Sequence, residues 1–176
     1  MKNYQSILNF SLLSAIVCLV AIYTLAYGWS TDGFDQSEVI LLALLPGLIT
    51  FVISLTLISI SLSKYLAFCR SQDVAPAKWW QLLLGTSFLT IVFLIAIDAV
   101  FFYVADQSLS QQYAEALGTF AQQGPNEMKE AALRAFAELP FLMQNGVTIG
   151  IFVLLANSLA VGVAKYITRK PILELY

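Results

Sequence analysis

Four long stretches of this sequence carry no charged side chain: residues 3–31, 39–63, 79–97 and 139–164. A helix needs about 20 apolar residues to cross the roughly 30 Å hydrocarbon core of a bilayer. Each stretch meets or nearly meets that length. Only 11% of all residues are charged, whereas soluble domains average about 25%. We therefore predict an all-α integral membrane protein whose single domain, residues 1–176, is a bundle of four transmembrane helices.

The predicted spans cover residues 6–27, 39–63, 79–104 and 143–165. An alternative interpretation of the first span is a cleaved signal peptide. Its apolar region, however, is longer than the roughly 7–15 residues typical of a signal sequence. We expect it to be retained as a helix. The second span contains Pro46 next to a glycine, which predicts a kink.

The charged residues separate by membrane side once the spans are fixed. The side with both termini and the 64–78 loop receives seven Lys and Arg and two carboxylates, whereas the other side receives two basic and eight acidic residues. Short loops rich in Lys and Arg stay in the cytoplasm, so we expect both termini there. The basic residues are scattered at helix ends, and we expect no nucleic-acid partner.

Residues 106–140 form the one sizeable segment outside the predicted spans, and their pattern predicts an extracytoplasmic hairpin of two amphipathic helices. Apolar residues recur every three or four positions in each half, and Gly124-Pro125 separates the halves. The hairpin could lie on the membrane surface, cap the bundle or meet a partner. We predict that its apolar residues contact a partner. These residues are Leu109, Tyr113, Leu117, Phe120, Met128, Phe136 and Leu139.

Asp98 is the one ionisable residue inside a predicted span, six residues before Val104. Intramembrane carboxylates are costly and usually face the bundle interior or water, which makes Asp98 a functional candidate. No Lys, Arg or His lies within a predicted span to pair with it. Three roles remain open: a structural contact to Asn145, Thr148 or a backbone group near Pro46, a contact to a partner or ligand, and a proton or cation relay.

The fourth predicted span carries two packing features. Asn157 lies near its centre, where an amide seeks a partner across a helix interface. Gly146 and Gly150 form a GxxxG pair, which predicts close helix packing either within the chain or at a homodimer seam.

The residue types argue against an enzyme. The chain has no histidine, which removes imidazole metal sites and Ser-His or Cys-His catalysis. It contains no glycine-rich phosphate loop, no GxSxG and no CxxC motif. We expect no catalytic residue, no metal and no cofactor.

The surroundings that we expect are a lipid bilayer and either a membrane-protein partner or further copies of the chain. The missing motifs and the patterned hairpin predict a non-enzymatic accessory or assembly subunit of a membrane complex. The alternative is a small oligomeric transporter or channel that uses Asp98 and neighbouring polar groups.

The layout of the chain also resembles a bacterial family. The third span ends in the aromatic run 101–104, an acidic helical segment follows at 112–115, and Arg169-Lys170 closes the fourth span. With four spans and a basic loop, the chain resembles the small membrane proteins grouped as domain of unknown function 4199. The family's usual glycine-serine-phenylalanine stretch before span three is replaced here by residues 74–78. The resemblance implies a multi-pass protein of the bacterial inner membrane, without catalytic residues to transfer.

Overall fold

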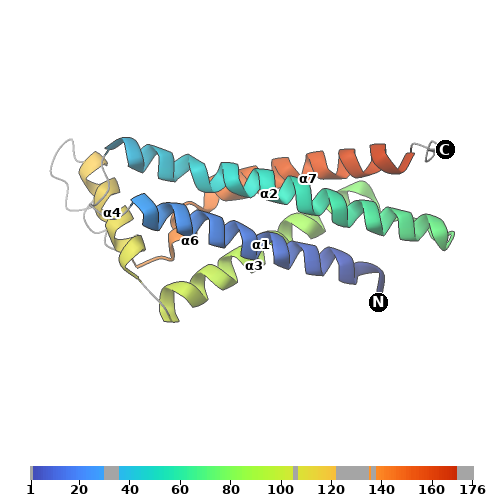
Figure 1. Ribbon diagram of the computed structural model, residues 1–176, viewed down its shortest axis with the longest axis horizontal. Helices are drawn as coiled ribbons and strands as arrows, with labels where there is room; N and C mark the ends of the chain where they lie inside the picture. The colour runs from blue at the N-terminus through green and yellow to red at the C-terminus, as the bar shows by residue number, and fades with distance from the viewer. Residues whose placement is uncertain (1, 30–35, 105–106, 122–134, 136–137, 170–176) are drawn as a thin grey trace.

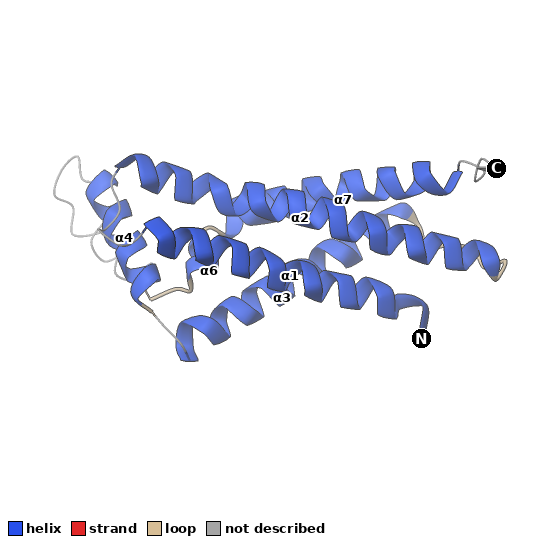
Figure 2. Cartoon of the chain, viewed as in Figure 1, coloured by secondary structure: helices blue, strands red, loops and turns tan. Residues whose placement is uncertain are grey.

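The protein is a bundle of helices. The computed structural model describes residues 2–29, 36–104, 107–121, 135 and 138–169. Within these residues every regular element is a helix and no strand is present (Figure 2). Four helices are long and apolar enough to cross a membrane, which confirms the predicted all-α fold with four spans. They are α1 (Lys2–Trp29), α2 (Gln36–Ser71), α3 (Trp79–Val104) and α7 (Gly146–Arg169).

The four long helices run side by side along the long axis of the molecule (Figure 1). Helices α1 and α7 each contact both α2 and α3. A shorter helix, α4 (Ser108–Ala121), lies across one end of the bundle and contacts α2. The four-residue helix α6 (Phe141–Gln144) contacts α3, α4 and α7, so it joins this covering helix to the bundle.

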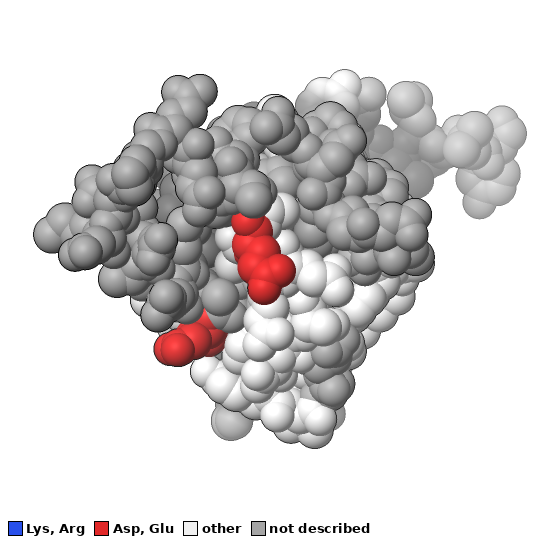
Figure 3. All heavy atoms as spheres, turned by 90° about the vertical axis from the view of Figure 1, so that its left-hand side faces the viewer, with Lys and Arg blue, Asp and Glu red and all other residues white. Residues whose placement is uncertain are grey.

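The two ends of the bundle carry opposite charge. The end covered by α4 carries Glu115 and Glu138 and, among the described residues, no Lys or Arg (Figure 3). We call it the acidic end. Helix α1 begins and α7 ends at the opposite end (Figure 1), which we call the basic end. Its described cations include Lys64, Arg70, Lys78 and Lys165.

Helix α2 is longer than the sequence predicted: it ends at Ser71 rather than at residue 63. The helix continues because Tyr65 and Cys69 extend its buried face, with 4% and 3% of their surface exposed. Asp73 then adopts a left-handed conformation, with φ 53°. The N–H of Asp73 donates to the Arg70 carbonyl and that of Val74 to the Cys69 carbonyl. These two bonds form a Schellman motif, which stops the helix.

Helices α2 and α7 are in close contact at Gly47. A Cβ atom there would lie 2.4 Å from Cδ2 of Phe152 and 3.0 Å from Cγ2 of Thr148. Glycine is therefore required for this contact. Pro46 lies within the continuous helix α2, and its carbonyl accepts a hydrogen bond from the Thr50 hydroxyl at 2.6 Å.

Buried polar side chains separate two apolar clusters inside the bundle. One cluster includes Ile22 and Phe141, towards the acidic end, and the other includes Ile58 and Leu62, towards the basic end. Each long helix contributes to the polar layer between them, which we call the polar belt. Its members are Ser11, Ser14, Thr50, Ser54, Ser87, Thr90 and Asn157. Lipid tails are as apolar as leucine, so polar contacts of this kind help to hold membrane helices together.

Candidate functional site

Asp98 lies in helix α3 and is completely buried. Its position six residues before Val104 puts it roughly 9 Å inward from the end of the helix at 1.5 Å per residue. The Tyr23 hydroxyl of α1 donates to one carboxylate oxygen at 2.6 Å. The backbone N–H of Leu142 in α6 donates to the other at 3.0 Å. Both oxygens are therefore bonded to other helices of the same chain.

The carboxylate completes the start of helix α6. The first N–H groups of a helix have no acceptor within the helix and carry partial positive charge. Pro140 precedes α6 and provides no side-chain cap. Asp98 supplies the missing acceptor from α3, so a short, broken helix can lie at this depth without leaving the Leu142 N–H unsatisfied. This contact explains a buried carboxylate in a helix, Trp79–Val104, that contains no Lys, Arg or His.

These partners of Asp98 differ from those that the sequence predicted. Asn145 accepts a hydrogen bond from the Tyr113 hydroxyl at 3.0 Å and donates to the Phe141 carbonyl at 3.2 Å. The methyl carbon of Thr148 faces Gly47. Tyr23 and Leu142 were both missed: the register between α1 and α3 is not visible in the sequence, and a backbone N–H leaves no side-chain signal.

Aromatic rings surround this junction. The ring of Tyr23 lies 4.5 Å from that of Phe101 and 6.0 Å from that of Phe141, measured between centroids. The Phe141 ring also meets that of Tyr113 at 5.2 Å, edge to face. These rings and the bonds of Asp98 connect α1, α3, α4 and α6 in one contiguous cluster, which we call the Asp98 junction.

Helix α4 closes the junction from the acidic end. Leu109 and Tyr113 are each only 2% exposed, and Leu117 is half-buried against the same cluster. The Gln144 side chain donates to the Ser110 carbonyl at 3.2 Å, which attaches α6 to α4. Burial raises the pKa of the Tyr113 phenol to about 12, because the ionised form loses its hydration.

The burial of Leu109 and Tyr113 corrects their predicted place on a partner surface. Their apolar face packs on the protein's own core, because the open end of a four-helix bundle is itself an apolar surface that needs a cover. Leu139 is 38% exposed and lies in a bend rather than in a helix. Met128, Phe136 and the Phe120 side chain, and with them the second helix of the predicted hairpin, lie outside the described residues.

Asn157 lies in the polar belt, where its amide nitrogen donates to the Ser87 hydroxyl of α3 at 3.1 Å. Across the bundle, Ser14 of α1 and Ser54 of α2 are joined by a hydrogen bond of the same length. Three buried atoms of the belt have no hydrogen-bond partner: Oδ1 of Asn157, Oγ of Ser11 and Oγ1 of Thr90. The polar belt therefore contains buried oxygen atoms that could form further hydrogen bonds.

Gly146 and Gly150 do not mediate close packing within the chain, which contradicts the first of the two predicted alternatives and leaves the homodimer seam as a prediction. A Cβ atom added at either position meets nothing within 4 Å. The close approach is made instead by Gly47, facing Phe152 of α7. The Pro-Gly pair in the sequence was the available signal, but it predicted a kink rather than a contact.

In the described part of the chain, no group of three or more Cys, Asp or Glu residues is arranged so that it could hold a metal ion. No family model matches this chain, and neither the curated proteins nor the solved structures yield a match. The site is therefore defined by geometry alone: a buried carboxylate in a multi-pass membrane protein, bonded between helices of its own fold.

Proposed function

We propose that this protein is a non-enzymatic accessory or assembly subunit of a membrane-protein complex. The observation that carries the proposal is that both carboxylate oxygens of Asp98 accept hydrogen bonds from the chain itself, one from Tyr23 and one from the Leu142 backbone. A carboxylate used in this way stabilises a scaffold, because each of its oxygens holds another helix of the same chain. A rigid four-span scaffold closed at one end suits a subunit that supports other membrane proteins.

The partner surface in this proposal is the side of α4 that faces away from the bundle. Gln107, Gln111 and Glu115 are exposed on it, and Glu138 lies on the same acidic end (Figure 3). A complementary partner would present polar and basic groups there. This surface replaces the buried positions Leu109 and Tyr113 of the sequence prediction.

The proposed location is the bacterial inner membrane, with both termini in the cytoplasm. The described cations gather at the end where α1 begins and α7 ends (Figure 1). The positive-inside rule puts that end in the cytoplasm. The resemblance to the domain of unknown function 4199 family is part of the same proposal.

The test is a mild-detergent pull-down of the tagged protein from its host membranes, followed by mass spectrometry. The test variant carries Gln111→Arg and Glu115→Arg, and a matched control carries Gln72→Arg at the other end of the bundle. A stoichiometric partner that is retained by the wild type and the control but lost from the double variant would support the proposal. Recovery of the protein without a partner in all three preparations would contradict it.

A second candidate function, a small oligomeric transporter or channel, is favoured by one observation: the polar belt contains buried acceptors without partners, including Oδ1 of Asn157. In this role Asp98 would have to release its bond to Tyr23 or Leu142. Flux into liposomes that falls in both Asp98→Asn and Asn157→Leu variants would support transport. Unchanged flux in correctly folded Asp98→Asn protein would remove the central residue of this candidate.

A further inference from the structure

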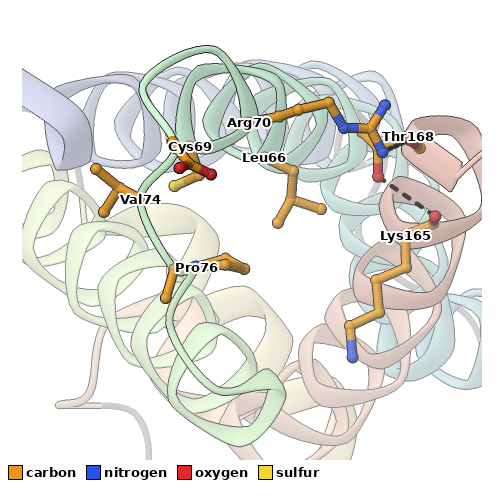
Figure 4. Close-up of a pocket in the computed structure, with 9 residues that line it drawn as sticks. Leu66, Cys69, Arg70, Val74, Pro76, Lys165 and Thr168 are labelled. Atoms are coloured by element: carbon orange, nitrogen blue, oxygen red, sulfur yellow. Dashed lines mark hydrogen bonds between the residues drawn. The ribbon is translucent and has the colours of Figure 1, made fainter.

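A cavity of about 600 Å³ lies at the basic end of the bundle (Figure 4). The last turns of α2 and α7 and the loop at residues 72–77 enclose it. Leu66, Val74 and Pro76 give it apolar walls, and its charged lining residues are Arg70, Asp73 and Lys165. Its volume is within the roughly 300–1,000 Å³ range of small-molecule sites.

The two cations approach the cavity from different helices. Arg70 comes from α2 and donates one of its guanidinium N–H groups to the Thr168 carbonyl of α7. A guanidinium has five such donors, so others remain for a ligand. Lys165 lies one turn earlier on α7 and extends along the same side of the opening (Figure 4). Among the described carboxylates, none forms an ion pair with Arg70 or Lys165.

The wall of the cavity is fixed in advance of any ligand. The Schellman motif at Asp73 turns the chain at the end of α2. The Ala77 N–H then donates to the Tyr65 hydroxyl at 3.0 Å, which holds the loop against α2. A preformed wall lowers the entropic cost of binding.

The level of the cavity in the membrane follows from the tryptophans beside it. Trp79 and Trp80 begin α3 directly after the loop and are 58% and 45% exposed. Tryptophan is enriched at the depth of the lipid headgroups. The cavity is therefore at the level where the phosphate groups of a bilayer lie.

We propose that this cavity binds an anionic phosphate group between Arg70 and Lys165, as carried by the headgroup of an acidic phospholipid. Arginine and lysine are the side chains that bind phosphate, and basic pockets at the ends of transmembrane helices suit anionic headgroups. Two cations and the Asp73 carboxylate give the lining side chains one net positive charge, which the C-terminal ends of α2 and α7 partly offset. This inference does not depend on the accessory-subunit proposal.

The experiment measures retention of phosphatidylglycerol and phosphatidylcholine by the full-length protein in mild detergent, using native mass spectrometry. Lys165→Gln is the test variant, because Arg70 also supports the end of α7. Lys64→Gln is the matched control: it removes an equal charge at the same end but outside the cavity, where Lys64 lies 5.0 Å from the centre of the Phe10 ring. Asp73→Asn removes the one carboxylate of the lining, and asparagine tolerates the left-handed conformation.

The wild type is expected to retain phosphatidylglycerol in preference to phosphatidylcholine. Lys165→Gln should weaken this retention about fivefold, the effect of roughly 1 kcal/mol for a partly exposed charge pair. Asp73→Asn should strengthen it by a similar factor, and Lys64→Gln should leave it unchanged. The opposite signs of the Lys165 and Asp73 variants exclude general unfolding as the cause.

Competition with inorganic phosphate identifies the source of the anion. Retention of phosphatidylglycerol in excess phosphate would assign the site to a lipid headgroup, and its displacement would assign the site to a free phosphate ion. Both results support a phosphate site. Equal retention of the two lipids by the wild type, or an equal loss in Lys165→Gln and Lys64→Gln, would overturn the proposal.

Discussion

The acidic and basic ends of this bundle differ in how they are closed. At the acidic end, α4 covers the helix ends, and Asp98 connects α1, α3 and α6 through Tyr23 and Leu142. At the basic end, Arg70 reaches the last turn of α7, and a cavity of about 600 Å³ lies beside it.

This contrast separates the residues that stabilise the fold from those that are available to a ligand. Buried hydrogen bonds at the acidic end cannot be exchanged for bonds to water, so their loss is costly. The Arg70 and Lys165 side chains at the basic end are exposed and can exchange partners with solvent or lipid. Substitutions at the acidic end should therefore affect unfolding, whereas those at the basic end should affect binding.

Among the substitutions considered, Asp98→Leu is expected to lower the stability of the fold most. This change leaves the Tyr23 hydroxyl and the Leu142 N–H buried without an acceptor, at about 1–3 kcal/mol each. We expect the free energy of unfolding to fall by about 4 kcal/mol and the Tm in detergent by roughly 10 °C. Asp98→Asn should cost about half as much, because the amide oxygen still accepts one bond. A Tm for Asp98→Leu within the error of the wild type would refute a structural role of the junction.

The next largest effect on stability is expected at alkaline pH, where the Tyr113 phenol ionises. The phenol has its ordinary pKa of about 10 in the unfolded chain, and burial raises the pKa of Tyr113 to about 12 in the fold. The neutral form favours folding, so its contribution is complete below pH 10 and is lost as the pH rises from 10 to 12. The loss is about 2 kcal/mol.

The measurement is thermal unfolding against pH for the wild type and Tyr113→Phe, together with phenolate absorbance. The variant should lose less stability between pH 10 and 12, and its absorbance should lack one late-ionising phenol that the wild type has. Identical pH profiles would show that Tyr113 is accessible to water, contrary to its place under α4.

Gly47→Ala tests the tight contact between α2 and α7. The added Cβ would overlap the Phe152 ring, and overpacking of this kind costs about 1–3 kcal/mol. Gly150→Ala is the matched control, because its Cβ meets nothing within 4 Å and alanine favours a helix. We expect Gly47→Ala to lower the Tm, Gly150→Ala to preserve or raise it, and Phe152→Leu to rescue Gly47→Ala. A Gly47→Ala variant as stable as the control would contradict this contact.

The smallest expected effect is that of Arg70→Gln at the basic end. Arg70 is exposed and its described bond is to the Thr168 carbonyl, so the loss should be about 0.5–1 kcal/mol. Thermal unfolding should place its Tm within a few degrees of the wild type. If Arg70→Gln lowered the free energy of unfolding as much as Asp98→Leu, the two ends of the bundle would not differ in their contribution to stability.

The spans could be predicted from the sequence, because a charged side chain is costly in hydrocarbon and a membrane-spanning stretch is therefore nearly free of charge. The third span was predicted with the observed bounds, Trp79–Val104. The end of α2 was placed too early because Lys64 was taken as the end of the span. A lysine can extend its charge towards the interface while its helix continues, and Tyr65 and Cys69 keep that face buried.

The candidate site was only half predictable. A lone carboxylate in a span is visible in the sequence, since such a residue is costly and demands a partner. The amphipathic pattern of residues 108–117 was visible too, but periodicity shows only that a face is apolar. Whether that face meets a partner or the chain's own core depends on what lies beneath it, and the structure puts Leu109 and Tyr113 on the core.

Local composition was enough to predict the class of this protein, the number of its spans and the depth of Asp98, because the transfer of side chains into lipid depends on composition. Three features came from the fold: Asp98 bonds Tyr23 and the start of α6, Gly47 rather than Gly146 permits a close helix contact, and Arg70 and Lys165 border one cavity. Hydrogen bonds and packing act over a few ångströms in space, so sequence patterns do not show which residues they join. The hydrogen bonds among these contacts join residues 44 to 98 positions apart along the chain.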